Sequence, residues 1–222
     1  RGESFQAQVS MFVNNGDNQR TLNFRTWSQG QENAVIKILQ PTKDRDTANL
    51  RMGINLWQYL PNVERIVKIP PTMMLQSWMG SDFTNDDLVK SSSLTRDYTH
   101  QTEKKEILGN DMAVKIICIP KPEAPVAWGK IIVWLREADT VPLRQEYYSE
   151  NGELLKIMEG NEIRTFGKHT IPTRLVMTTV KKQASHPKAQ TELRYEKVVF
   201  DQKIDQNLFS QEFIRKPVKN TL

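Results

Sequence analysis

The chain has little sulfur chemistry and no long apolar run. Its 222 residues include one cysteine, Cys118, which excludes an internal disulfide and a cysteine-based metal cluster. The longest apolar runs, residues 116–120 and 131–135, have the length of strands and fall far short of the roughly 20 residues that a membrane-spanning helix needs. Because Cys118 lies within one of these runs, we interpret it as a small buried hydrophobe.

Histidine is also scarce, and its spacing does not predict a metal site. His100, His169 and His186 each lack a second ligand a few residues away, so zinc would need distant partners. The sequence also lacks a phosphate-binding glycine loop, a nucleophile elbow and a dinucleotide-binding fingerprint. We therefore expect no cofactor, no metal ion and no catalytic residue, and we do not expect an enzyme.

Charge of one sign is not concentrated anywhere. The formal net charge is +5 and the sequence pI about 9.2, but 31 Lys and Arg residues are interleaved with 26 acidic ones. The densest basic runs, residues 181–182 and 215–216, are short. Nucleic-acid-binding proteins normally gather basic residues on one face, so we expect no nucleic-acid partner. Attraction to an anionic membrane surface stays open.

Alternation of apolar and polar residues predicts a β-rich fold. Only 38% of the residues are hydrophobic, which suits a sheet with one face in water. Odd positions are apolar in residues 5–13, and residues 112–119 and 193–199 alternate in the same way. Further strands are expected at residues 21–28, 34–40, 54–59, 64–69, 99–107, 127–135, 143–148, 153–159, 162–166 and 173–181.

Turn signals separate these strands and predict an antiparallel meander. Asn151-Gly152 gives the clearest hairpin. The other signals are Asn15-Gly16, Gln29-Gly30, Gly109-Asn110 and Gly160-Asn161. Strands joined in order by short turns pair antiparallel. No repeat or linker divides the chain, so we expect residues 1–222 to form one domain.

Two segments depart from the alternating pattern. Residues 70–90 have helical spacing, in which Met74, Trp78 and Met79 share a face and Leu75 is adjacent. Gly80-Ser81 interrupts this spacing. Within this segment, a capping-type sequence predicts a short helix at residues 86–90. The tail, residues 205–214, is interpreted as a docked turn or short helix.

The methionine-rich part of residues 73–79 is the feature that points to function. It holds three of the eight methionines beside Trp78, and Trp57 and Tyr59 share a face of a strand just upstream. Methionine repacks around ligands of varied shape, and Trp and Tyr suit the mouth of a pocket. A helical lid could therefore close an apolar cavity over a sheet, although the same residues could simply fill a core.

Several motifs resemble one known family. Residues 53–61, Gly-Ile-Asn-Leu-Trp-Gln-Tyr-Leu-Pro, resemble the G-x-x-L-W-x-Y-x-P strand of the LolA/LolB superfamily of lipoprotein carriers. Residues 79–83, Met-Gly-Ser-Asp-Phe, followed by Asp87-Leu88, resemble the M-G-S-D-F…D-L segment of LolA-like outer-membrane lipoprotein-sorting proteins. Residues 128–130, 142–144, 172–177 and 204–210 also match this group. The matches extend from about residue 5 to residue 209.

The resemblance implies a mainly β fold: an unclosed antiparallel β-barrel with short helices lying over the concave face as a lid. Members of the family are periplasmic, chaperone-like carriers that bind the acyl chains of lipoproteins. The classical carrier receives its cargo from an inner-membrane ABC transporter and passes it to an outer-membrane acceptor. We accordingly expect a monomeric periplasmic carrier of lipoprotein acyl chains or another lipid, although no signal peptide stands at the start of the sequence.

The expected site residues follow from this hypothesis. Asp82 and Asp87 would fix the loop and the helix cap beside the lid, and Arg51 is a candidate for the key arginine of the classical carrier. The expected lipid contacts in the pocket and lid are Trp57, Tyr59, Met73, Met74, Trp78, Met79, Phe83 and Leu88.

Two other functions remain open. The chain could be a structural or interaction module of the cell envelope, with a lid that is permanent core. It could also be a lipid hydrolase that brings Ser81, His100 and Asp82 together, although their spacing gives no support to a catalytic triad.

Overall fold

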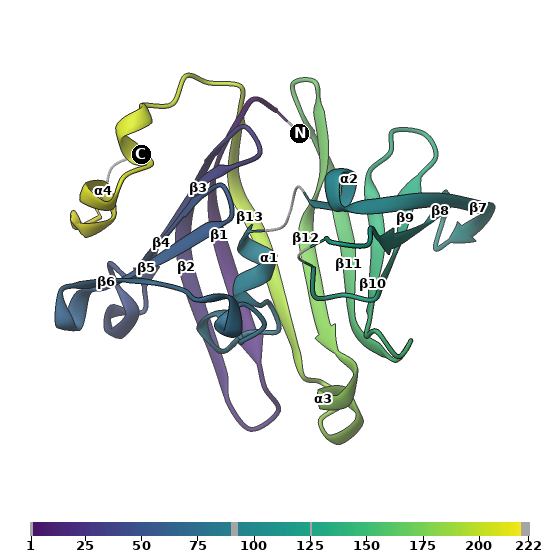
Figure 1. The fold of residues 1–222 in the computed structure, drawn as a ribbon. Helices are drawn as coiled ribbons and strands as arrows, with labels where there is room; N and C mark the ends of the chain where they lie inside the picture. Colours follow the sequence, from purple (N-terminus) through teal and green to yellow (C-terminus); the bar gives the residue numbers. More distant parts are fainter. Residues whose placement is uncertain (1, 90–92, 125, 219–222) are drawn as a thin grey trace.

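The chain folds into one antiparallel sheet that curves without closing (Figure 1). The structure, a computed structural model, describes residues 2–89, 93–124 and 126–218. Its 13 strands follow the order β6-β5-β4-β3-β2-β1-β13-β12-β11-β10-β9-β8-β7, so β6 and β7 form the two edges. The strands are β1 (Ser4–Asn14), β2 (Gln19–Gln29), β3 (Asn33–Gln40), β4 (Ala48–Met52), β5 (Asn55–Leu60), β6 (Arg65–Lys68), β7 (Tyr98–Leu108), β8 (Asp111–Pro120), β9 (Lys130–Arg136), β10 (Pro142–Tyr148), β11 (Leu154–Phe166), β12 (His169–Thr179) and β13 (Gln190–Phe200).

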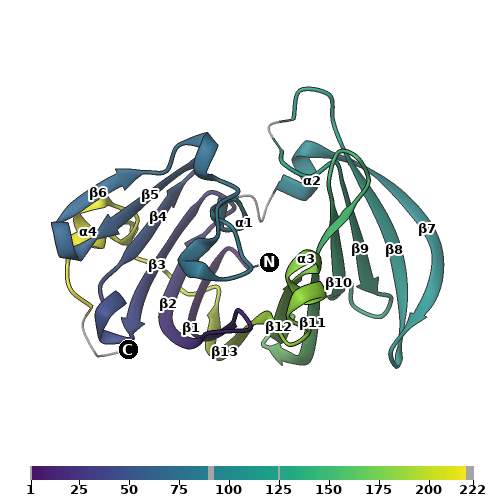
Figure 2. The same ribbon diagram turned by 90° about the horizontal axis from the view of Figure 1, so that it is seen from below.

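Two meanders make the two wings of the sheet. We call β1–β6 the first wing and β7–β13 the second wing. They join where β1 pairs with β13, from Phe5↔Phe200 to Asn14↔Gln190. Seen from below, the sheet forms a trough whose wings rise on either side of β1 and β13 (Figure 2). The expected fold, an unclosed antiparallel barrel with short helices, is confirmed.

Most predicted strands form near their expected positions, and the hairpin at Asn151-Gly152 joins β10 to β11. The turn expected at Gly160-Asn161 is wrong, because β11 continues through these residues and pairs with β12 on both sides of them. A Cβ atom at Gly160 would lie 2.6 Å from the carbonyl oxygen of Pro142. The glycine therefore serves a close approach of two strands.

Two further corrections concern β4 and the end of β12. The sequence pattern does not predict β4, because the side chains of Asn49 and Arg51 are buried along with those of Ala48 and Leu50. The strand expected to reach Lys181 instead ends at Thr179, where α3 (Val180–Ser185) begins.

Residues 70–89, which we call the lid segment, lie inside the trough against the first wing (Figure 2). The segment contains two single turns, η3 (Pro71–Met73) and η4 (Trp78–Gly80), and the short helix α1 (Asn85–Val89). Residues 70–79 form only these single turns and not the helix that their spacing predicts. The interruption expected at Gly80-Ser81 is confirmed, since Met79 and Gly80 have left-handed φ angles of 49° and 68°. The short helix expected at residues 86–90 corresponds to α1, with Lys90 outside the described residues. Another short helix, α2 (Ser93–Asp97), leads into β7.

The lid segment is held on the first wing by a buried tryptophan. Trp78 is 3% exposed and meets the Phe24 ring edge to face, with 5.6 Å between centroids. Its indole Nε1 donates a hydrogen bond to Asn49 Oδ1 at 3.0 Å. The same apolar cluster includes Met11 and Val13 from β1. The indole thus buries its ring and also satisfies its polar edge.

The tail covers the opposite, outer face of the first wing. Here η5 (Gln206–Leu208) and α4 (Gln211–Arg215) bring Phe209 and Ile214 against Leu50. The docked short helix expected at residues 205–214 is confirmed. Lys37, which is 2% exposed, donates to the carbonyl oxygens of Phe213, at 3.0 Å, and Lys216. A buried ammonium group therefore forms hydrogen bonds with carbonyl oxygens at the C-terminal end of α4.

This lysine predicts a specific dependence of stability on pH. Burial lowers the pKa of Lys37 to about 8, although Asp46 opposes the shift. As pH rises from about 8 toward 10.5, the ordinary lysine pKa, the unfolded chain keeps a proton that the folded protein has lost. The free energy of unfolding, relative to Lys37→Met, should therefore rise over this interval by roughly 2 kcal/mol.

Urea unfolding at a series of pH values measures this difference. A second variant, Lys43→Met, removes an exposed lysine from the neighbouring turn η1 (Thr42–Asp44) and serves as the control. A difference between wild type and Lys37→Met that stays flat across the alkaline range would contradict the prediction.

Candidate functional site

A cleft of about 580 Å³ lies between the lid segment and the second wing. It opens beside the turn that joins β10 to β11 and beside the start of α3. The lining residues are Leu75, Ser77, Ser81, Asp82 and Thr84 from the lid segment, and Ala127, Trp128, Ser149, Glu150, Asn151, Leu155, Lys156, Thr179 and Lys182 from the second wing and α3.

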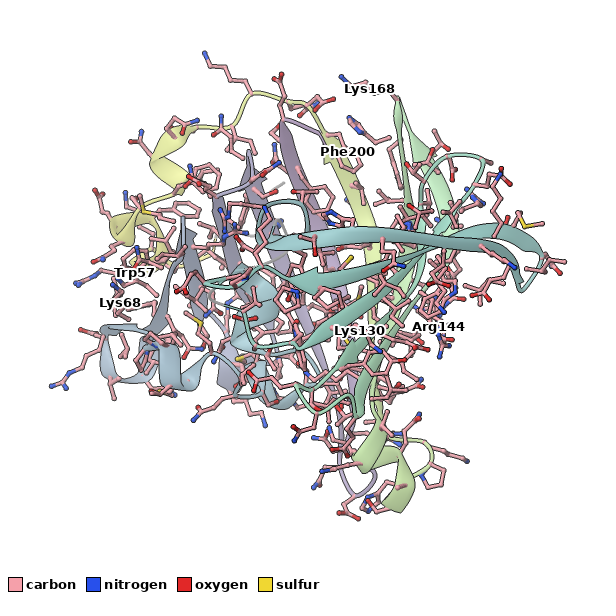
Figure 3. All side chains as sticks on the ribbon, turned by 45° about the vertical axis from the view of Figure 1, so that its right-hand side comes forward. Trp57, Lys68, Lys130, Arg144, Lys168 and Phe200 are labelled. Atoms are coloured by element: carbon pink, nitrogen blue, oxygen red, sulfur yellow. The ribbon has the colours of Figure 1, made fainter. Side chains whose placement is uncertain are left out.

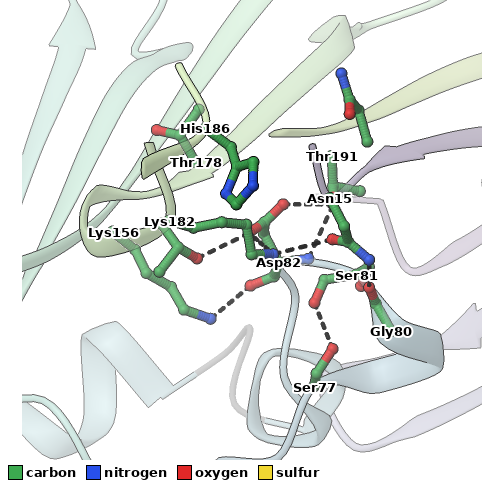
Figure 4. Close-up of polar contacts among 12 residues, drawn as sticks. Asn15, Ser77, Gly80, Ser81, Asp82, Lys156, Thr178, Lys182, His186 and Thr191 are labelled. Carbon is green, nitrogen blue, oxygen red and sulfur yellow. Dashed lines mark hydrogen bonds and ion pairs between the residues drawn. The ribbon is translucent and has the colours of Figure 1, made fainter. Parts of the chain in front are cut away.

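Asp82 fixes the lid segment to the second wing (Figure 4). Its side chain is fully buried, and its Oδ1 accepts hydrogen bonds from Thr179 Oγ1 at 2.8 Å and Lys182 Nζ at 2.7 Å. Its Oδ2 accepts from Thr191 Oγ1 at 2.8 Å, and its backbone N–H donates to the same hydroxyl oxygen. One carboxylate thus joins the lid segment to β12, α3 and β13.

Lys156 forms the second link between the lid segment and the second wing. Its Nζ donates to the backbone carbonyl oxygen of Asp82 at 2.5 Å and lies 3.9 Å from Asp87 Oδ2. The ammonium also lies 5.7 Å from the centre of the Trp128 ring. Burial lowers the pKa of Lys156, and the carboxylates of Asp87 and Asp82 oppose that shift. The Lys156 side chain lies at the wall of the cleft, with two carboxylates that favour its charged form.

Local hydrogen bonds shape the lid loop between these anchors. Ser77 Oγ donates a short hydrogen bond of 2.5 Å to the Ser81 carbonyl oxygen. Thr84 and Asp87 form a reciprocal cap at the start of α1: Asp87 Oδ2 accepts from the backbone N–H and the hydroxyl of Thr84 at 2.7 and 2.8 Å. The Asp87 N–H donates back to Thr84 Oγ1. This arrangement is the capping box that satisfies unpaired N–H groups at a helix start.

Trp128 forms the opposite, apolar wall. Its ring lies 5.2 Å from that of Tyr147, centre to centre. The next residue, Gly129, passes close to the β10–β11 turn: a Cβ atom there would lie 2.5 Å from the Ser149 carbonyl oxygen. The glycine therefore allows the segment just before β9 to pack closely against the β10–β11 turn. This packing places Trp128 beside Lys156.

The structure does not gather all the predicted lipid contacts. Trp78 and Phe83 are buried in the inner cluster, with Met79 and Leu88 partly buried against it. Met74 packs on a smaller cluster around Leu56 and Ile69, and Met73 is 37% exposed. Of the residues predicted to bind lipid or to support the lid, only Asp82 lines the cleft, and Ser81 of the hydrolase hypothesis lines it as well.

Trp57 and Tyr59 lie on the other side of the sheet. Both belong to the outer cluster beneath the tail, because they pair with Leu50 and Ala48 on the same face. Lys68 lies 5.9 Å from the Trp57 ring on this side (Figure 3). Arg51, at the end of β4, donates to the carbonyl oxygens of Gly53, at 3.2 Å, and Gln31.

Sequence patterns do not single out most of the cleft. Leu155 and Lys156 lie in the strand predicted at residues 153–159. Trp128 lies in the strand predicted at residues 127–135 and in the family match at residues 128–130, but none of the three is among the expected pocket residues. The useful signal for Lys156 is its charge between Leu155 and Ile157, which becomes informative only when the strands are placed beside the lid segment. Lys182, between Lys181 and Gln183, carries no such signal.

The three residues of the hydrolase hypothesis have separate partners. Ser81 Oγ donates to the Trp78 carbonyl oxygen at 2.7 Å, and His100 Nε2 lies 2.8 Å from the Leu94 carbonyl oxygen. Across residues 2–89, 93–124 and 126–218, Ser81 and His100 share no hydrogen bond. Within the same ranges, no group of three or more metal-binding side chains could hold an ion, and no helix is long and apolar enough to cross a membrane.

The curved sheet and its lid segment have the fold of the LolA superfamily. A candidate outer-membrane lipoprotein-sorting protein domain from Vibrio parahaemolyticus matches with a TM-score of 0.84 and 23% identity, covering 96% of this chain and 92% of that one. A DUF1329 family protein from Desulfovibrio piger matches with a TM-score of 0.89 and 18% identity, at the same coverage. A LolA superfamily protein from Nitrosomonas europaea gives 0.77 and 21%, again covering 96% and 92%.

A family model described as "Uncharacterized protein" matches residues 30–216, and the chain belongs to that family. No curated protein matches the sequence. The expected resemblance to the LolA-like proteins is confirmed in the fold, with the match extending along nearly the whole chain.

The buried carboxylate makes a testable contribution to stability. Asp82→Asn keeps the shape of the side chain but leaves Lys182 without its charged partner. We expect a loss of about 3 kcal/mol in the free energy of unfolding, as for other buried ion pairs that lose one member. Urea unfolding measures the loss. Asp17→Asn is the matched control, since the Asp17 side chain is 82% exposed; equal stability of the two variants would show that Asp82 is not an anchor.

Proposed function

We propose that the protein is a non-enzymatic periplasmic carrier that binds the acyl chain of a lipoprotein, or of another lipid, between the lid segment and the second wing. The cargo would move toward the outer membrane, and an inner-membrane ABC transporter and an outer-membrane acceptor are the partners that such a route requires. Support for the location and the route comes from the similarity in fold to lipoprotein-sorting proteins.

The cleft is the observation that carries this proposal. Its volume of about 580 Å³ falls within the range of small-molecule sites in proteins. Leu75 reaches it from the lid segment, while Trp128 and Leu155 form the facing wall. Leu75 is 55% exposed, so an apolar side chain stands at the cleft without being covered by the protein itself.

The inner face of the second wing extends this apolar surface. Ile116, Leu135 and Met158 are only partly buried, although they pack against the inner cluster. A hydrocarbon chain lying along them would remove their remaining exposed area from water. Each buried methylene group contributes about 0.8 kcal/mol, so a long chain would bind firmly without a covalent bond or a cofactor.

The competing hypothesis, a structural module with a permanent lid, also has an observation in its favour. Trp78 and Phe83 are as buried as ordinary core residues, so this part of the lid segment is packed on the first wing. The two hypotheses differ at the cleft on the other side of the segment. A carrier binds lipid there, and a structural module does not.

Leu75→Asp tests the carrier hypothesis without disturbing the core. Placing a carboxylate against the acyl chain should weaken binding by about tenfold or more, because an unpaired charge would be buried in the complex. Stability should be nearly unchanged, since the leucine side chain is largely in water. Titration with a fluorescent fatty acid measures affinity, and native mass spectrometry of the purified protein reports bound lipid.

Ile54→Asp is the matched control. Ile54 is 71% exposed and lies in the turn between β4 and β5, outside the cleft lining. It should bind the fatty acid like the wild type. Absence of acyl binding by the wild-type protein would defeat the carrier hypothesis and favour the structural module.

A further inference from the structure

The cleft has a cationic end as well as an apolar wall. Lys156 and Lys182 both line it, together with hydroxyl groups of Ser77, Thr84 and Thr179. Figure 4 shows the two lysines reaching Asp82 from different elements. Lipid-binding surfaces made only for hydrocarbon do not need buried ammonium groups, whose transfer from water is costly.

Lys156 has donor capacity that its protein partners do not use. An ammonium can donate three hydrogen bonds. In the part of the chain that the structure describes, Lys156 Nζ makes one, to the Asp82 carbonyl oxygen, while Asp87 Oδ2 is beyond hydrogen-bond distance at 3.9 Å. The residue is 9% exposed. An acceptor entering the cleft would therefore meet a poorly hydrated cation.

The carboxylates at the site do not offer an equivalent place to a cationic ligand. Both oxygens of Asp82 accept hydrogen bonds from the protein, and the side chain has no exposed surface. Asp87 is used by the cap with Thr84. Glu150 is the remaining acidic residue of the lining and lies in the β10–β11 turn, at the rim.

Lys182 adds a second cation beside the first. Its Nζ is bonded to Asp82 Oδ1 and Asn15 Oδ1, at 2.7 and 3.1 Å, and its side chain is 29% exposed. One N–H of the ammonium thus has no hydrogen-bond partner among the described residues, and the residue lines the cleft. The lowered pKa of Lys156, caused mainly by burial, is the shift that an anionic ligand would reverse.

We propose that this end of the cleft binds the anionic head of the lipid, a phosphate or a carboxylate, through Lys156 and Lys182 while its acyl chain lies against Leu75, Trp128 and Leu155. The inference rests on the proposed carrier function and narrows its cargo to acidic amphiphiles. It assigns a recognition role to two lysines that also hold the lid loop.

The test compares ligands that share a chain and differ in the head. A fatty acid and the fatty alcohol of the same length, and a lysophosphatidic acid and the matching monoacylglycerol, are titrated calorimetrically into the wild-type protein. The acidic ligand of each pair should bind about tenfold more tightly, as one charge-assisted hydrogen bond would provide. This comparison does not depend on the folding of any variant.

Variants then assign the preference to the site. Lys156→Met should abolish the difference between acid and alcohol, and Lys156→Arg should retain most of it because the charge remains. Lys181→Met is the control: Lys181 neighbours Lys182, its side chain is 76% exposed, and it pairs with Glu153 instead of lining the cleft. Its preference for the acid should equal that of the wild type.

The outcomes separate the two proposals. Equal binding of acid and alcohol by the wild type would overturn the head-group site and leave the carrier function intact. Binding of neither would overturn the carrier function itself. Inorganic phosphate that bound as tightly as lysophosphatidic acid would show a site for a free anion and would also overturn the assignment to a lipid head.

Discussion

The position of the lid segment depends on one buried carboxylate. A carboxylate without access to water is stable only when protein groups donate the hydrogen bonds that water would otherwise supply. Asp82 meets this condition with donors from β12, α3 and β13, which lie about a hundred residues away in the sequence. The cleft exists because this contact keeps the loop at the second wing while Trp78 holds the preceding turn on the first wing.

The two faces of the sheet are used for different purposes. On the first wing, the outer face is sealed by the tail and the inner face by the lid segment. The inner face of the second wing remains partly uncovered, and the cleft follows from this asymmetry. Aromatic residues therefore cannot be assigned to a ligand from the strand alone: Trp57 packs beneath the tail on the outer face, whereas Trp128 lines the cleft.

The fold could be predicted because its signals are local. Period-two alternation and the Asn151-Gly152 turn specify strands and hairpins within a few residues, and the motif around Asp82 adds the family architecture. The site could not be predicted to the same extent. Which face of β5 receives the tail depends on contacts with residues more than a hundred positions away, such as those of Tyr59 with Ile204 and Phe209. In the lid segment, Gly80 marks the break in the sequence itself, but helical spacing does not reveal the left-handed backbone angle of Met79.

The place of the lid segment in the chain order has a mechanical consequence. The segment lies between β6 and β7, which are the two free edges of the same sheet. The described parts of the polypeptide between these edges, the lid segment and α2, lie on the open side of the trough (Figure 2). Because the chain is continuous between β6 and β7, a change in the distance between the two wings would also move the lid segment.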